Sequence, residues 1–294
     1  MKKLFFALLL LSASWIAAAE GPCDYVGGVP ALRINGCWLP QSEIFAPLIA
    51  DPRTITNSGG IRFNDNVIGK YVGACSFGSQ FGIFRWNNFM RTCGKMQFDI
   101  EAGIFSVFDL KHPDASMVNT DFFVAGMLTY ARNCWSYRFR LWHQSCHLGD
   151  EFLVANPGFD RRNVSDEAVD FFASYQFCPP IRAYGGIGYI FDRDRTFPEH
   201  PLYFEWGAEA KVFGSVDCYN RVVVQPFLAI HFRSWEEHDF DIDQTYALGA
   251  EWSRIKGTGR NVRMFVQYHD GFSREGQFIR QRSNYVELRF TYGF

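Results

Sequence analysis

The chain lacks the features that mark several large functional classes. Its formal net charge is only −2, from 29 Lys and Arg against 31 Asp and Glu, so we expect no nucleic-acid partner. Beyond residue 20 there is no run of about 18 apolar residues, which excludes membrane-spanning helices there. The eight cysteines show no C-x-x-C spacing, so the sequence predicts no metal site. Gly185, Gly186 and Gly188 lack the following helix that a dinucleotide-binding loop requires.

The first twenty residues have the three parts of an export signal. Lys2 and Lys3 form a positive start, residues 4–11 are apolar, and residues 17–19 are the small alanines that a signal peptidase needs. The apolar run is shorter than the roughly 20 residues of a spanning helix. We therefore expect a signal peptide over residues 1–19. Residues 20–58 show no clear periodicity, and we interpret them as a periplasmic N-terminal segment.

What the sequence has in abundance is strict alternation of apolar and polar residues. In the last segment every second residue is apolar: Val286, Leu288, Phe290, Tyr292 and Phe294 alternate with Glu287, Arg289 and Thr291. Successive side chains of a strand point to opposite faces, so this pattern predicts a strand with one apolar and one charged face. About twelve such segments occur, near residues 59–66, 76–87, 95–108, 120–131, 136–147, 167–177, 181–192, 202–213, 221–233, 242–255, 261–269 and 283–294.

The connections between these segments differ in length. Short connections lie at 133–135, 178–180 and 256–259, and longer, more charged ones lie at 109–119, 148–166, 193–201, 234–241 and 270–282. Short periplasmic turns and long external loops are typical of outer-membrane β-barrels. Strands of about 10–13 residues also suit a tilted membrane crossing better than a soluble β-sandwich. We predict an all-β transmembrane antiparallel barrel of about 12 strands over residues 59–294, in the outer membrane of a Gram-negative bacterium.

The eight cysteines all follow the predicted signal peptide and reach an oxidising compartment, which permits disulfides. Six lie in the N-terminal segment or in or beside predicted periplasmic turns and are disulfide candidates: Cys23, Cys37, Cys93, Cys134, Cys178 and Cys218. Cys75 and Cys146 lie on predicted strands. Two interpretations stay open. The turns are stapled within the chain, as Cys93 with Cys134 would be, or the thiols cross-link the protein to other envelope proteins.

One group of residues suits covalent chemistry. His143 and Ser145 share the parity of the apolar residues on segment 136–147, so we expect them on the lipid-facing wall near the outer leaflet. A histidine beside a serine is the arrangement that a serine nucleophile needs for removal of its proton. Glu167 also has outward parity, and it begins the next strand, where it can orient His143. An alternative loop site consists of His147, Asp150 and Glu151.

Phe45–Arg53 (FAPLIADPR), His143–Phe152 (HQSCHLGDEF) and Asp270–Phe278 (DGFSREGQF) resemble the family known as domain of unknown function 1207, or DUF1207. The likeness runs from about Pro40 to Phe294 and implies an exported bacterial envelope protein, with no established activity. The many cysteines depart from the family pattern. The His143-x-Ser145 pair is similar to that of outer-membrane phospholipase A and the lipid A deacylases. In those families a His and a Ser on the outer wall of a barrel attack membrane lipid esters, and an acid or amide orients the His.

Two functions follow from these observations. The sequence favours a passive structural or narrow-pore barrel stabilised by periplasmic disulfides, because inward charges of both signs suit a filled lumen. The alternative is an outward-facing serine lipid hydrolase that uses His143 and Ser145. We expect no cofactor, although a divalent cation at the outer-leaflet site stays open. Outer-membrane lipids are the expected partners in both cases.

Overall fold

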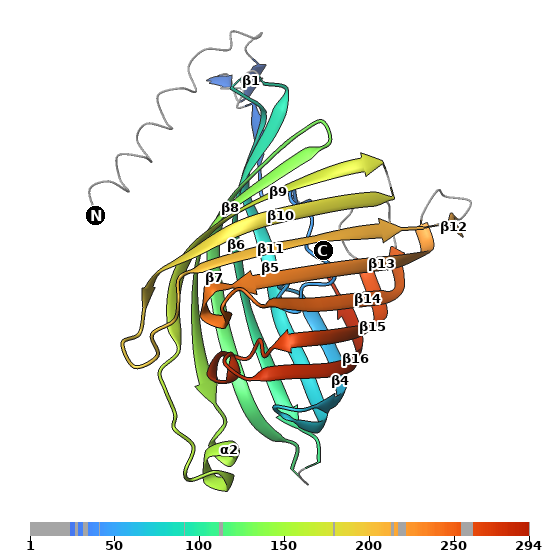
Figure 1. Ribbon diagram of the computed structural model, residues 1–294. Helices are drawn as coiled ribbons and strands as arrows, with labels where there is room; N and C mark the ends of the chain where they lie inside the picture. The colour runs from blue at the N-terminus through green and yellow to red at the C-terminus, as the bar shows by residue number, and fades with distance from the viewer. Residues whose placement is uncertain are drawn as a thin grey trace.

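The alternating segments become the strands of a single barrel in the computed structural model (Figure 1). The structure describes residues 24–26, 29–31, 35–40, 42–90, 92–111, 114–178, 180–212, 215–216, 222–253 and 261–293. Its elements are β1 (Asp24–Val26), β2 (Val29–Ala31), β3 (Gly36–Trp38), β4 (Asn57–Asp65), β5 (Gly69–Phe89), β6 (Gly94–Asp109), β7 (Ser116–Arg132), β8 (Trp135–Leu148), α2 (Asp150–Ala155), β9 (Ser165–Cys178), β10 (Ile181–Arg193), β11 (Leu202–Lys211), β12 (Ser215–Val216), β13 (Val222–Trp235), η1 (Glu236–His238), β14 (Ile242–Ser253), β15 (Asn261–Phe272), η2 (Gly276–Phe278) and β16 (Arg282–Tyr292).

The barrel closes because its last strand pairs with its first. β16 is antiparallel to β4 from Tyr292↔Asn57 to Val286↔Phe63, and β11 pairs directly with β13, so the short β12 is not part of the ring. The closed ring therefore has 12 strands, as predicted, and β3 is an extra strand that pairs with β5. The largest difference from the sequence prediction is at β5, which begins at Gly69 rather than near residue 76. No helix in the described part of the chain is long and apolar enough to span a membrane.

The two faces of each strand differ as the alternation predicts. Along β16 the exposed Val286 and Leu288 alternate with the buried Glu287 and Arg289. In an outer-membrane barrel the outward apolar residues contact lipid and the inward residues line the lumen. The protein is thus an outer-membrane β-barrel with an apolar wall and a charged interior.

The charges of the interior pair with one another. Arg140 on β8 lies 2.7 Å from Asp170 on β9 and 3.2 Å from Glu101 on β6. Arg263 on β15 likewise lies 2.7 Å from Glu251 on β14. A buried charge is stable only when an opposite charge or hydrogen bonds compensate for the loss of water. These pairs tie strands of the wall together on its inner face.

Residues 45–56, which precede the first wall strand, lie inside the barrel. Phe45 and Leu48 are buried against Phe172 of β9 and Tyr184 of β10, both of which point inward. This contact buries apolar surface inside the protein, so it stabilises the segment through protein contacts alone.

Hydrogen bonds hold the same segment to the wall. Arg182 donates to the carbonyl oxygen of Ala46 at 2.8 Å, and the Ile49 amide donates to Glu209 at 2.8 Å. The sequence interpretation assigned residues 20–58 to a segment outside the barrel, whereas residues 45–56 form part of its interior. The periplasmic location of the rest stays a prediction, and the predicted signal peptide lies outside the described residues.

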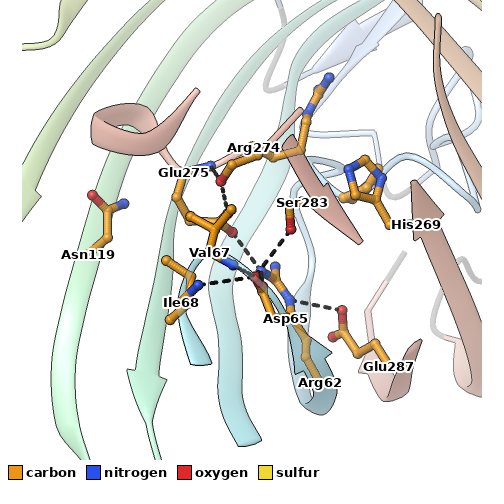
Figure 2. Close-up of polar contacts among 12 residues, drawn as sticks. Arg62, Asp65, Val67, Ile68, Asn119, His269, Arg274, Glu275, Ser283 and Glu287 are labelled. Carbon is orange, nitrogen blue, oxygen red and sulfur yellow. Dashed lines mark hydrogen bonds and ion pairs between the residues drawn. The ribbon is translucent and has the colours of Figure 1, made fainter. Parts of the chain in front are cut away.

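The loop between β15 and β16 covers the lumen at the end opposite to the β5–β6 turn. Arg62 of β4 lies 2.9 Å from Glu275 of this loop, and it also lies 3.4 Å from Asp65 and 3.3 Å from Glu287. Figure 2 shows these residues together. Burial is the largest single influence on Glu275 and raises its pKa, but the charges of Arg62 and Arg53 and the hydrogen bonds from Ser273 and Arg62 together outweigh it and lower the pKa to about 2. The described interior retains cavities of about 20 Å³, each with room for a single water. In the described part of the barrel, residues 45–56 and the paired charges occupy the interior around these cavities.

The described cysteines do not form the predicted staples. Five are free thiols: Cys37, Cys75, Cys93, Cys134 and Cys146. The predicted pair of Cys93 with Cys134 is wrong because their hairpin turns are two strand spacings apart, roughly 10 Å at about 4.8 Å per strand. A disulfide needs Cα atoms within about 7 Å. The side chains of three further candidates lie outside the described residues: Cys23, Cys178 and Cys218.

Candidate active site on the outer wall

Strand β8 carries the candidate residues on its lipid-facing side. Phe139 and Leu141 are exposed on the outer wall, and His143 and Ser145 continue the same face toward the long-loop end of the strand. Cys146 faces the opposite way and is only 4% exposed. The period-2 alternation of the strand therefore fixes the outward direction of His143 and Ser145, as the sequence predicts.

Strand β9 places Glu167 beside His143. The two residues are direct cross-strand partners in the β8–β9 ladder. His143 Nδ1 and Glu167 Oε1 lie 3.1 Å apart, with the side chains 40% and 41% exposed. A carboxylate that accepts from Nδ1–H fixes the tautomer of the ring and leaves Nε2 able to accept a proton.

Ser145 lies two residues from His143 on the same face of β8. Such positions are separated by roughly 7 Å along a strand, a gap that an imidazole ring turned along the strand can span. Among the hydrogen bonds of the described residues, none joins His143 to Ser145. Catalytic hydrogen bonds are often long in a free enzyme and shorten when substrate binds. Across the strand pair, Ser145 faces Ser165 of β9 and Phe122 of β7.

The rival residues of the loop site do not gather in the same way. His147 is the next outward residue of β8, and its ring lies 5.5 Å from that of Phe122. Asp150 and Glu151 start helix α2, and both are exposed. No hydrogen bond or ion pair among the described residues joins these two carboxylates to His147. The structure therefore places Glu167 beside the imidazole of His143. Among the described residues, neither Asp150 nor Glu151 contacts the imidazole of His147.

The surroundings of the His143–Glu167 pair are apolar on the membrane side. Val124 on β7 is the partner of His143 on its other edge, and Val124, Leu141 and Phe171 are exposed on the same wall. The His143–Glu167 pair therefore adjoins an apolar surface on the outer wall.

Comparison with known proteins identifies the family of this chain and solved structures with a similar fold. Residues 18–294 match the family described as "Protein of unknown function (DUF1207)". The chain belongs to this family. No curated protein sequence matches it significantly.

Solved structures similar to the DUF1207 chain include two phospholipases. Outer membrane phospholipase A from Escherichia coli has a TM-score of 0.57 at 10% identity, with 81% of this chain and 92% of that chain covered. The Salmonella typhi outer membrane phospholipase, solved as a dimer with bound calcium, has a TM-score of 0.55 at 10% identity, with coverages of 83% and 93%. At these identities the likeness shows a shared fold.

The three stretches that resemble the DUF1207 family meet in space. Arg274 of the third stretch lies 3.6 Å from Asp51 of the first. Gly276 of the third stretch lies against Cys146 of the second, where an added Cβ would come within 2.7 Å of the Cys146 Cβ. The inner side of the β8 segment that carries Ser145 therefore rests on the loop that covers the lumen.

A group of potential metal ligands lies in the interior and was missed from the sequence. Asp51, Glu205 and His231 have ligand atoms within 4.8 Å of one another. His231 Nε2 has no hydrogen-bond partner and lies 4.0 Å from each carboxylate. However, Arg274 lies 3.6 Å from both carboxylates and Arg233 3.6 Å from Glu205, so the two negative charges are already balanced.

This interior group suits a water molecule better than a metal ion. Two neighbouring guanidinium groups repel a divalent cation strongly at low dielectric. A water can accept from a guanidinium and donate to both carboxylates. The three ligands lie on separate elements, far apart in sequence, so no motif marks them. In the part of the chain that the structure describes, no comparable group of three ligands gathers at the outer wall.

Proposed function

We propose that the protein hydrolyses ester bonds of outer-membrane lipids, with Ser145 as nucleophile, His143 as general base and Glu167 as the residue that orients His143. One observation carries the proposal: the 3.1 Å contact between His143 and Glu167 on the lipid-facing wall, two residues from Ser145. A side-chain contact as exposed as this one contributes little to stability. Its position is therefore better explained by chemistry than by folding.

The geometry supports a serine-hydrolase sequence of steps. Ser145 Oγ attacks the carbonyl carbon of a lipid ester while His143 Nε2 takes the hydroxyl proton. Glu167 accepts from Nδ1–H and stabilises the imidazolium that forms. The imidazolium then gives its proton to the departing lipid alcohol, which leaves an acyl group on Ser145. A water molecule, deprotonated by His143, releases the fatty acid and restores the serine.

The fold is consistent with this substrate class. The barrel is similar to outer membrane phospholipase A, a protein named for its action on phospholipids. The candidate residues face the membrane, so a lipid reaches them by diffusion in its own leaflet. Residues 45–56 and the paired charges occupy the described interior, which favours a structural barrel over an open pore as the second candidate function.

A lipase assay on the refolded protein tests the proposal. Fatty-acid release is measured from detergent-dispersed phospholipid and, separately, from lipopolysaccharide. We expect wild type to release fatty acid and Ser145→Ala to release none above the blank. Ser165→Ala is the matched control, because Ser165 is the cross-strand partner of Ser145, and it should retain activity.

Each alternative outcome has a clear meaning. Activity that survives in Ser145→Ala, or is lost only in Ser165→Ala, contradicts the assignment of the nucleophile. Absence of release by correctly folded wild type on both lipids contradicts the hydrolase and favours the structural barrel. Folding is checked by the shift in gel mobility between heated and unheated samples.

A further inference from the structure

Strands β8 and β9, which carry the candidate site, separate just beyond it. Their ladder runs to the pair Ser145↔Ser165, after which the Cys146 amide donates to the Val164 carbonyl at 3.0 Å. Residues 149–164 then connect the two strands through α2, so no tight turn holds their ends together. On its β9 side, Ser145 therefore lies at the end of a ladder, where the sheet restrains a residue less than in the middle of a strand.

The loop between β15 and β16, which we call the lid loop (residues 273–281), touches β8 from inside the barrel at this point. An added Cβ on Gly276 would lie 2.7 Å from the Cβ and 3.0 Å from the Sγ of Cys146, and 3.1 Å from Asp121 Oδ1. The Gly276 amide donates to Asp121 Oδ2 at 3.2 Å, and Asp121 is the β7 partner of Cys146. The backbone of the lid loop thus approaches β8 so closely that only glycine fits.

The next residue of the lid loop holds the segment that enters β9. The Gln277 side chain accepts a hydrogen bond from the Arg162 amide at 3.2 Å and donates one to the Arg162 carbonyl. Arg162 lies three residues before Ser165 and five before Glu167. Gly276 and Gln277 are both buried. Two consecutive residues of the lid loop therefore connect β8 and the start of β9 on the inner side of the candidate site.

The lid loop is itself held firmly. Arg53 of the interior segment donates to the carbonyl of Arg274 and to the carboxylate of Asp121. Arg62 lies 2.9 Å from Glu275. A buried ion pair is costly to break, because loss of one partner leaves the other charge uncompensated. The lid loop is therefore a fixed support behind β8 rather than a loose covering.

We propose that Gly276 and Gln277 are positioning residues of the outer-wall site, and that the lid loop sets the place of Ser145 relative to His143 from inside the barrel. This role rests on the proposed hydrolase function. Ser145 and Cys146 are consecutive residues on opposite faces of β8, so a shift of Cys146 moves Ser145 as well. A misplacement of about 1 Å can lower a rate about a hundredfold. The lid loop lies on the inner side of the wall, so its contacts act on kcat and leave KM unchanged.

Substitution of Gly276 tests this role in the refolded protein. Gly276→Ala should push Cys146 outward and lower the kcat of fatty-acid release, per folded barrel, at least about a hundredfold at an unchanged KM. Gly158→Ala is the matched control, because nothing lies within 4 Å of an added Cβ there, and it should retain the wild-type kcat. The heated and unheated gel bands give the folded fraction of each variant.

A second substitution shows whether the contact with Cys146 transmits the effect. Cys146→Gly removes the atoms that the methyl group of Gly276→Ala would meet first. Gly276→Ala should therefore lower kcat by no more than about tenfold in a Cys146→Gly background. Gln277→Ala adds no bulk, removes the contact with Arg162 and should lower kcat about tenfold at an unchanged KM. It decides the matter where Gly276→Ala fails to fold.

Three results would overturn the positioning role. They are a wild-type kcat in folded Gly276→Ala or in folded Gln277→Ala, an equal cost of Gly276→Ala with and without Cys146→Gly, and an effect confined to KM. Each of these results requires an active wild type, so each leaves the proposed hydrolase in place. A folded wild type that releases no fatty acid contradicts the hydrolase itself, and the positioning role with it.

Discussion

The two faces of β8 carry polar residues that differ in what they contact. On the inner face, Arg138 and Arg140 both lie within 4 Å of Asp170, and Arg140 also reaches Glu101. On the outer face, the His143–Glu167 contact is about 40% exposed and stands beside an apolar surface. Inside the barrel an unpaired charge is strongly destabilising, so the inner charged residues need opposite charges nearby. The partly exposed His143–Glu167 pair is not needed to balance a buried charge, so it can act in a reaction without a cost to folding.

Loss of the nucleophile or the base should have the largest effect and should leave the inner face untouched. Ser145→Ala and His143→Ala are each expected to reduce lipid hydrolysis by at least about a thousandfold. The free energy of unfolding should change by no more than about 0.5 kcal/mol, because both positions are at the surface. Rates of fatty-acid release and urea unfolding in detergent measure the two. A large loss of unfolding free energy in either variant would show that the outer face of β8 also stabilises the fold, which would contradict the proposed difference between its two faces.

Loss of the orienting charge should have a smaller effect on the same reaction. Glu167→Gln retains an oxygen that accepts from His143 Nδ1–H but removes the charge that stabilises the imidazolium. We expect a loss of activity about a hundredfold smaller than that of Ser145→Ala. The effect should fall on kcat rather than on KM. An effect confined to KM would show that Glu167 binds lipid instead of orienting the ring.

Loss of an inner charge should act on stability alone. Arg140→Ala leaves Asp170 and Glu101 without their closest cation and should lower the free energy of unfolding by about 3–5 kcal/mol. Arg282→Ala is the matched control, because its pair with Asp241 is 58% exposed on both sides, and no measurable change is expected. Urea titration of the refolded barrels checks this. Equal effects of the two substitutions would refute the importance of burial.

The smallest expected effect concerns the loops at the far end of the barrel. Burial, with help from the charge of Arg233, lowers the pKa of His238 from 6.5 to about 3. A neutral His238, bonded to the Ile279 carbonyl at 2.8 Å, therefore stabilises the loops above pH 6.5. That contribution declines as the pH falls from about 6.5 toward 3, because protonation then favours the unfolded loop.

Limited proteolysis of the loops between pH 7 and pH 4 measures this effect. We expect wild-type loops to be cleaved faster as the pH falls. His238→Gln retains an N–H donor but does not titrate, so its pH dependence should be weaker. An identical pH dependence in both proteins would assign the effect to other groups.

The sequence alone determined the wall of the barrel. The twelve alternating segments correspond to the twelve wall strands because side-chain direction in a strand has a period of two, which is local information. The same rule placed His143, Ser145 and Glu167 on the outer wall. The hairpin between β8 and β9 then made His143 and Glu167 neighbours, because antiparallel pairing joins the end of one strand to the start of the next.

Only the tertiary structure decided what fills the barrel. Residues 45–56 have no periodicity, and their contacts with Phe172, Arg182 and Glu209 are made to residues more than 100 positions away. The interior group of Asp51, Glu205 and His231 likewise forms only when the ring closes. The predicted pairing of Cys93 with Cys134 was wrong for the related reason that adjacent turns in sequence are two strands apart in space. Alternation reports which face a residue occupies, whereas distances across the lumen follow from closure of the sheet.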